Sequence, residues 1–339
     1  MKKRKKTKTR KIMNIALFVL ASFTLVVGIH IGYLYKKAEN ALHQISVNSS
    51  VQGNEFLQGN KVNNVVDTPI LFLLAGVDSR EGGDGMMNTD VLMLVSFNPK
   101  TKSASFLSIP RDLLIQPESL PSRKANYYYA HHYIKDKAEV IPNTKKFFSD
   151  VFGLPIDYMV VVNFEMLTEL VDLLGGLEID VDMDMKYRDT YDGTNINLKQ
   201  GLQRLDGGQV LDFVRYRKSN QGTKESSDFE RNDRQQQVMK QILEKLGAYQ
   251  GISQWGKVLD IIGENVKSDI PEDYIKQWVF NFPKIKPEQM NSLKVESVWK
   301  NPFVYFMKEE LEEAISSMQR ELGIASGHSI RVDRVGVIE

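Results

Sequence analysis

Residues 70–109, ILFLLAGVDSREGGDGMMNTDVLMLVSFNPKTKSASFLSI, contain three short apolar runs separated by Gly-rich and Asn-Pro links. Runs of this length and composition, bounded by turn residues, favour β-strands. We expect three strands, at residues 70–75, 91–97 and 103–109. The link at 98–101 is short enough for a hairpin, and the link at 79–89 also allows an antiparallel return. The stretch therefore predicts an antiparallel meander.

Charged residues stand where these strands begin or end. Asp78 follows the first strand, Asp90 precedes the second and Arg111 follows the third. In an antiparallel meander these three positions meet at one edge of the sheet. Two carboxylates beside a cation suit a Mg²⁺ ion that serves a phosphate, because Mg²⁺ takes carboxylate oxygens and completes its shell with phosphate oxygens and water. Asp also commonly caps turns, so the spacing alone leaves that simpler interpretation open.

Strand and helix signals alternate through the rest of the chain. We expect helices at 144–152, 164–174, 205–211, 228–246 and 308–322, and strands at 158–163, 177–181, 213–217 and 293–298. Gly175-Gly176 is a common signal for the C-terminus of a helix. This order predicts an α/β fold with helices packed on both faces of a central mixed sheet.

A second group of charged residues lies around a predicted helix start. On the expected strand, Arg215 and Arg217 are two apart and project from one face. A polar loop at 218–227 follows, and Ser227 with Glu230 matches a capping box that starts the next helix. Free backbone amides and the positive end of the helix dipole favour an anion at such a start.

The first turns of that helix continue the cationic pattern. Arg231, Arg234 and Gln235 share one face, and Asp228 precedes Arg231 by about one turn. Several guanidinium groups in one place suit a multiply anionic ligand, and Arg binds phosphate in a bidentate manner. The alternative is a solvated Arg/Asp network on the surface, which is more credible for Arg234 than for the strand arginines.

The N-terminal residues have the pattern of a membrane anchor. Residues 1–11 hold eight Lys/Arg, and residues 12–34 contain no Asp, Glu, Lys or Arg. At about 1.5 Å per residue the apolar stretch spans a bilayer core, and the basic tail keeps the start in the cytoplasm. Residues 35–67 are predicted to be a spacer and 68–339 an extracytoplasmic globule. A cleaved signal peptide is the alternative, but no small-x-small site lies near Leu34.

The overall composition excludes several classes of protein. The chain has 339 residues with 44 Lys/Arg against 43 Asp/Glu, and ten of these bases lie in residues 1–37, which contain no acid. The remainder has 34 bases against 43 acids and a formal charge of −9. That balance argues against a nucleic-acid binder, which needs a broad basic face. The absence of Cys excludes disulfides, thiol catalysis and Cys-ligated zinc.

Several motifs resemble those of the LytR-CpsA-Psr family of cell-wall phosphotransferases. The matching stretches, spread over residues 70–243, are LLAGVDSR, NTDVLML, SIPRDLLI, KANYYYA, VVNFEMLTELVDLLGGLEIDV, LKQGLQRLDGGQVLDFVRYR and DFERNDRQQQVMKQI. The resemblance implies an α/β/α layered domain over 68–339, with the motifs in 70–243 and a C-terminal part at 251–339. It also implies transfer of a glycopolymer, such as teichoic acid or capsular polysaccharide, from an undecaprenyl-diphosphate carrier to peptidoglycan. A phosphodiester forms and the lipid phosphate is released.

The resemblance also implies roles for individual residues. Asp78 and Asp90 would hold Mg²⁺, the implied cofactor. The residues expected at the diphosphate are Arg80, Arg111, Arg215, Arg217, Arg231, Arg234 and Gln235, with Asp228 beside them. Asn88 stands where the family usually has Arg, so either the site is weaker at that side or Arg80 or Lys124 substitutes for the missing contact. His131 and His132 stand where glycines are common and could alter acceptor access; a metal site there would need two further ligands.

Other parts of the expected activity are less closely tied to motifs. We expect an apolar slot for the polyprenyl tail between the sheet and the helices at 164–174 and 238–246. Asp228, or a water on Asp78, is a candidate base for the acceptor hydroxyl. Two alternative functions share the same site: a non-catalytic sensor or attenuator of envelope synthesis that binds lipid phosphates, and a lipid-diphosphate hydrolase. The expected location is the cell membrane of a Gram-positive type of bacterium.

Overall fold

The computed structural model describes residues 36–45, 65–77, 87, 89–190, 193–226, 228–248, 252–324 and 332–339. The predicted tail and anchor at 1–34 lie outside these ranges. No helix within them is both long and apolar enough to cross a membrane. Part of the predicted spacer is ordered: residues 36–45 form a helix that buries Ala41, Leu42 and Ile45, and η1 (Val65–Asp67) is a single 3₁₀ turn.

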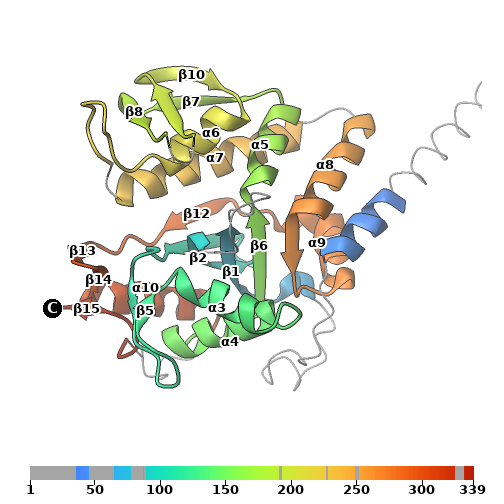
Figure 1. Cartoon of the computed structure of the whole chain (residues 1–339). Helices are drawn as coiled ribbons and strands as arrows, with labels where there is room; N and C mark the ends of the chain where they lie inside the picture. Colours follow the sequence, from blue (N-terminus) through green and yellow to red (C-terminus); the bar gives the residue numbers. More distant parts are fainter. Residues whose placement is uncertain are drawn as a thin grey trace, which may run out of the picture.

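The central sheet contains the predicted meander. β1 (Ile70–Val77), β2 (Thr89–Asn98) and β3 (Ser103–Ser108) pair in antiparallel fashion. β6 (Tyr158–Asn163) runs parallel to β1, and the C-terminal part adds both edges, β11 (Val266–Ser268) and β12 (Gln289–Ser292). The strand order is β11-β6-β1-β2-β3-β12, so the sheet is mixed, as the sequence predicts (Figure 1).

Helices cover both faces of this sheet. Leu71, Leu73 and Ala75 alternate along β1 and join one buried cluster. That cluster includes side chains from α3 (Tyr127–Lys135), α4 (Val140–Phe152) and α10 (Lys308–Glu321). Phe72 points to the opposite face, where its ring lies 5.8 Å from that of Trp278 on α9 (Glu272–Ile285). The period of two in a strand thus gives the sheet two buried faces.

A second lobe stands above the sheet and has its own core (Figure 1, top). Its strands are β7 (Leu177–Val181), β8 (Met185–Arg188), β9 (Asn195–Leu198) and β10 (Gly201–Leu205). Its helices are α5 (Phe164–Leu173), α6 (Gly207–Arg215) and α7 (Asp228–Ala248), and α8 (Ile252–Asn265) packs against α5. Gly176 ends the turn after α5 with φ +83°, and a Cβ there would lie 2.8 Å from the Leu205 carbonyl oxygen. The predicted glycine stop is therefore also a site of close packing.

A separate small sheet lies beside the central sheet, at the left of Figure 1. It consists of β13 (Ser297–Lys300), β14 (Phe303–Met307) and β15 (Val337–Ile338). Leu113 bridges to Val304 of β14, and β4 (Leu114–Ile115) continues from there to pair with β5 (Arg123–Lys124). The chain that leaves β3 is thereby attached to this small sheet.

Two predicted strands are wrong. Residues 213–217 do not form a strand, because α6 extends to Arg215. Apolar and Arg residues alternate there like a strand, but Asp206 and Gln209 form a capping box, and Val210, Phe213 and Val214 then fall on one buried helical face. Residues 293–296 lie between β12 and β13 rather than within a strand.

Arg234 fastens α7 to the rest of the upper lobe. The helix begins at Asp228, as predicted, and Arg234 lies two turns inside it with 2% of its surface exposed. Its guanidinium donates to both carboxylate oxygens of Asp182, at 2.7 Å each, and to the carbonyl oxygen of Tyr216 at 3.2 Å. This bidentate pair, with a buried guanidinium and a carboxylate that is 37% exposed, holds the turn after β7 and the end of α6 against α7.

Removing this pair tests its structural role. Arg234→Ala leaves the Asp182 carboxylate and the Tyr216 carbonyl without their donor, so we expect the free energy of unfolding to fall by about 2–3 kcal/mol. Lys199→Ala is a control in the same lobe, because Lys199 pairs with Asp184 on the exposed surface at 3.1 Å. Thermal unfolding followed by circular dichroism should show a lower midpoint for Arg234→Ala alone. Equal midpoints for the two variants would contradict the role.

Candidate active site

Two of the three residues predicted to meet at the strand ends, Asp90 and Arg111, lie together. In the register of β2 and β3, Met93 pairs with Ser108. The same register, continued three residues further, sets Asp90 opposite Arg111. Arg111 Nη1 donates to Asp90 Oδ1 at 2.6 Å, and both side chains remain partly exposed. Residues 21 apart in sequence thus form one ion pair at the edge of the sheet.

This pair opens into a pocket to which α7 and β13 contribute. We call it the charged pocket. Its lining residues are Asp90, Val91, Leu92, Ser108, Ile109, Pro110, Arg111, Arg231, Gln235, Val295, Ser297 and Phe306. Arg111 Nε and Gln235 Oε1 are buried and make no hydrogen bond within the described part of the chain. Buried polar atoms usually have a partner, so these two atoms indicate a polar ligand in the pocket.

The carboxylate of Asp112 contacts three cationic side chains beside the charged pocket. This carboxylate, only 7% exposed, accepts from Arg217 Nη1 at 3.1 Å and lies 2.9 Å from Lys124 Nζ and 4.0 Å from Arg111 Nε. Burial alone would raise the pKa of this carboxyl, but the hydrogen bonds from Lys124 and Arg217 outweigh burial and lower the pKa. Asp112 is therefore ionised at neutral pH and holds three cations together without a ligand.

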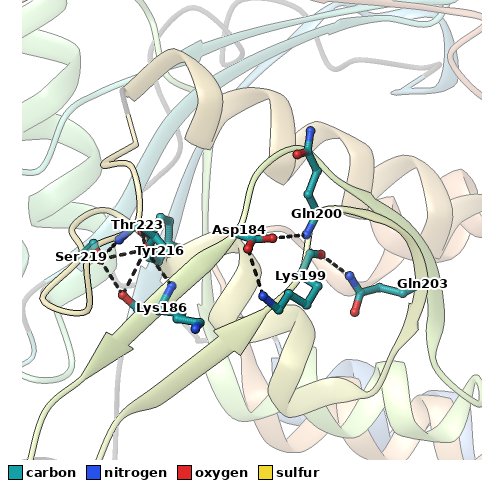
Figure 2. A network of polar contacts seen from close by, with 8 residues as sticks. All are labelled: Asp184, Lys186, Lys199, Gln200, Gln203, Tyr216, Ser219 and Thr223. Atoms are coloured by element: carbon teal, nitrogen blue, oxygen red, sulfur yellow. Dashed lines mark hydrogen bonds and ion pairs between the residues drawn. The ribbon is translucent and has the colours of Figure 1, made fainter.

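Tyr216 positions the two arginines on either side of it. Its ring is fully buried, and its hydroxyl contacts Thr223 Oγ1 at 2.9 Å and donates to the Lys224 carbonyl oxygen at 2.7 Å. Figure 2 shows how this loop is fixed to β8, with the Ser219 hydroxyl donating to the Lys186 carbonyl oxygen at 2.9 Å. The segment between α6 and α7 is therefore held at Tyr216 and at Ser219, and these contacts fix the position of the Arg217 backbone between them.

Arg215 lies on the other side of Tyr216, over an aromatic ring. Its guanidinium carbon is 4.2 Å from the centroid of the Phe164 ring, so the ring face stabilises the cation. Asp212 precedes it by one helical turn. Burial raises the pKa of Asp212 to about 6, and the nearby charge of Arg215 opposes that rise.

An apolar cavity of about 660 Å³ adjoins the charged pocket. It lies between the upper face of the sheet and helices α5 and α7, at the position where we expect an apolar slot from the sequence. Its apolar lining comprises Leu74, Val91, Met93, Phe106, Phe164, Leu167, Val214, Val238, Met239, Ile242 and Met290. Val91 and Gln235 line both the cavity and the charged pocket. The two spaces therefore share a wall.

Not every predicted site residue can be placed at this pocket. Asp78, Arg80 and Asn88 lie outside the described residues. Asp228 is the first residue of α7, but its side chain is outside the described part as well. Arg234 lies on α7 with its guanidinium committed to Asp182 and Tyr216, so its placement does not support a contact with a diphosphate.

The two adjacent histidines have different surroundings. His132 is buried and its Nδ1 lies 3.1 Å from the Thr144 hydroxyl; burial lowers its pKa to about 4, so it is neutral at physiological pH. His131 lies against the ring of Tyr127, with 3.2 Å between its Nδ1 and the Tyr127 hydroxyl. The two rings therefore serve packing and local hydrogen bonds on α3.

Two residues that organise the site, Asp112 and Tyr216, are not among those predicted from the sequence. Asp112 stands next to Arg111, and the only sign of its burial is the apolar LLI that follows it. Tyr216 stands between two arginines and looks like one position of an alternating strand. Both act through contacts with segments more than five residues away, which local patterns do not reveal.

Comparison with known proteins agrees with this architecture. The chain is 30% identical over 278 residues to a teichoic acid transferase, TagU of Bacillus licheniformis, covering 80% of this chain and 82% of that protein. It is 27% identical over 334 residues to the teichoic acid transferase TagT of Bacillus subtilis, covering 95% and 98%. A solved structure of TagT bound to LIIa-WTA has the same fold, with a TM-score of 0.57 at 23% identity, covering 82% of this chain and 99% of that one.

The family assignment rests on a match over most of the sequence. The model described as the LytR_cpsA_psr family matches residues 31–322, which include every element of the charged pocket and of the apolar cavity. The chain therefore belongs to the LytR-CpsA-Psr family.

Proposed function

We propose that this protein is a phosphotransferase that moves an anionic glycopolymer, of teichoic acid or capsular polysaccharide type, from an undecaprenyl-diphosphate carrier to peptidoglycan. One observation carries the proposal: a cationic pocket shares a wall with a large apolar cavity. A polyprenyl diphosphate has the same division, with a doubly charged diphosphate joined directly to a long apolar chain. The names of the relatives and the family support the same activity.

The charged pocket suits the diphosphate. Arg111 and Arg231 line it, and Arg217 stands beside it on Asp112. Arg binds phosphate oxygens in a bidentate manner, and buried donors such as Arg111 Nε gain a partner when a phosphate enters. Arg215 lies over Phe164, which lines the apolar cavity, and would bind the phosphate nearer the lipid. Gln235 on the shared wall would support the same oxygens.

The reaction breaks one phosphorus–oxygen bond and forms another. A muramic acid hydroxyl of the acceptor attacks the phosphorus that carries the glycopolymer, and the bond from that phosphorus to the lipid phosphate breaks. The product is a phosphodiester and the leaving group is undecaprenyl phosphate. Negative charge grows on the bridging oxygen, and the fixed cations of the pocket stabilise it. The hydroxyl proton passes to a base, for which Asp228 or a water on Asp78 is our candidate.

The residues present fit a magnesium ion. Asp90 is the carboxylate of the charged pocket, and a Mg²⁺ site that includes substrate phosphates needs only one or two carboxylates. Within the described ranges no three His, Asp or Glu side chains cluster as a complete metal cage. Asp90, together with Asp78 from outside those ranges, would hold the ion. When bound, it would supply positive charge shared between the two phosphates.

We further propose that residues 12–34 anchor the chain in the cell membrane, with residues 1–11 in the cytoplasm and residues 68–339 outside. Composition supports this arrangement, since the apolar stretch has the length of a membrane span and follows a basic tail. A lipid-linked donor and a cell-wall acceptor both fit a catalytic domain at the outer membrane surface.

Replacing a pocket arginine tests the proposed transfer. Arg111→Ala or Arg217→Ala removes a cation that faces the developing charge, so we expect the rate of transfer to fall about 10²-fold or more. Arg188→Ala, an exposed arginine of the upper lobe, should keep the wild-type rate. Mass spectrometry of the products with a lipid-diphosphate-linked donor and peptidoglycan oligomers measures the transfer.

The same assay separates the alternatives. Glycopolymer joined to glycan supports transfer, whereas free glycopolymer phosphate would show a hydrolase. Binding of the donor without any product would show a lipid-phosphate sensor. Wild-type activity in Arg111→Ala and Arg217→Ala would contradict the assignment of the charged pocket.

The metal assignment predicts a change in the Mg²⁺ requirement. Asp90→Asn removes one anionic ligand, so a higher Mg²⁺ concentration should be needed for half-maximal transfer. Asp273→Asn, whose side chain is 85% exposed on α9, is the matched control and should leave the requirement unchanged. Titration of the chelator-treated protein with Mg²⁺ measures both variants. An unchanged requirement in Asp90→Asn would contradict the role of Asp90.

Filling the cavity tests its occupant. Leu167→Trp places a larger side chain on the α5 wall, so we expect the KM for a donor with a full-length polyprenyl tail to rise several-fold. A donor with a short prenyl tail should be affected less. Leu202→Trp makes the same change at a site 74% exposed on β10 and serves as the control. An equal effect on both donors would mean that the tail binds elsewhere.

A further inference from the structure

A tryptophan stands exposed on β13, the strand whose first residue lines the charged pocket. Trp299 lies on β13 with 50% of its surface open to solvent. Large aromatic rings are usually buried, so an open one at an edge strand calls for an explanation. The proposed reaction above does not use it.

The strand that carries Trp299 begins inside the charged pocket. Ser297 lines that pocket, and its partner across the strands, Phe306, lines it as well. Residues two apart on a strand share a face, so Trp299 projects from the same face as Ser297, about 7 Å further along. Its partner Val304 is buried on that face. The ring therefore forms the outward continuation of the pocket wall.

Two contacts fix this ring to the cation network. Lys124 Nζ lies over the ring, 5.5 Å from its centroid, and 2.9 Å from the buried Asp112 carboxylate. The Val304 amide donates to the Asp112 carbonyl oxygen at 2.8 Å. The backbone of Asp112 thus holds β14, and its carboxylate holds the lysine that lies over the Trp299 ring. Such support gives the exposed ring a defined place relative to the pocket.

The in-line geometry of phosphoryl transfer determines which substrate approaches the charged pocket from the side of Trp299. In phosphoryl transfer the attacking and leaving oxygens lie roughly in line through phosphorus. The leaving lipid phosphate faces the apolar cavity, through the wall formed by Val91 and Gln235. The attacking hydroxyl must therefore come from the opposite side. Ser297 and Phe306 line the charged pocket but not the cavity, and they lead to Trp299.

We propose that Trp299 binds a sugar ring of the acceptor glycan by stacking, and so places the acceptor hydroxyl in line with the phosphorus. This inference rests on the proposed transfer and deepens it. An aromatic face carries partial negative charge, and the C–H groups on one face of a pyranose carry partial positive charge. A flat, preoriented indole can hold such a ring while the sugar hydroxyls remain hydrated. Trp299 is then a binding residue for the acceptor and has no part in binding the donor.

The test separates acceptor from donor. With the full-length protein, an undecaprenyl-diphosphate-linked glycopolymer and peptidoglycan glycan oligomers, Trp299→Ala should raise the KM for the oligomer about tenfold. The KM for the donor and kcat at saturating oligomer should stay close to wild type. Trp299→Tyr should recover most of the loss, and Val298→Ala, exposed on the other face of β13, should change nothing. Normal melting of the Ala variant excludes misfolding.

A binding measurement keeps this test independent of turnover. The chain contains three Trp, and addition of the oligomer should change the fluorescence of the wild type but not of Trp299→Phe. An unchanged oligomer KM in an active Trp299→Ala variant would overturn the inference alone. A rise in the donor KM instead would assign the ring to the sugar of the donor and overturn it as well. If the wild type forms no glycan-linked product, the proposed transfer fails, and the fluorescence titration still decides whether Trp299 binds the oligomer.

Discussion

A buried carboxylate, that of Asp112, is the constraint on which the site depends. Cationic side chains gathered at one site repel one another. The Asp112 carboxylate offsets this repulsion, because it accepts hydrogen bonds from Arg217 and Lys124 and lies close to Arg111. Each of these cations comes from a different segment of the chain. One internal anion therefore does two things: it stabilises the folded state without a ligand, and it brings distant segments together.

The two cores of the molecule explain why the cavity exists. The sheet with its lower helices forms one core, and the upper lobe forms another. Where they face each other, α5 and α7 stand over the upper face of the sheet without filling the space beneath them. A well-packed interior leaves few voids larger than a water molecule, so an apolar space of this size between two complete cores is a feature of the fold rather than a packing error. The cationic residues lie at its rim because strand ends and the start of α7 meet there.

The parts of this arrangement that follow local rules could be predicted from the sequence. The antiparallel meander determines the meeting of Asp90 and Arg111, since register alone sets them opposite each other. The strand predicted at residues 213–217 is wrong, because apolar and Arg residues alternate there as they do in a strand. The cap at Asp206 and the buried face of α6 stabilise a helix instead. The burial of Asp112 depends on a loop after α6 and on the β13–β14 hairpin, both remote in sequence. Contacts between segments that are far apart in the chain produce no periodic pattern in the sequence.

The short helix at residues 36–45 has a consequence for mechanical coupling. It packs against α8, where Lys37 contacts Asp260, and Lys267 of β11 donates to the Gln44 carbonyl oxygen. A helix that is docked in this way keeps a fixed orientation relative to the domain, whereas a flexible linker would limit only the distance between the domain and the membrane. With residues 12–34 in a bilayer, as we propose, these contacts would set the angle and height at which the cavity mouth meets the lipid. Carrier lipids would then enter along a direction dictated by the docked helix, and lengthening the chain after residue 45 would leave that direction unchanged.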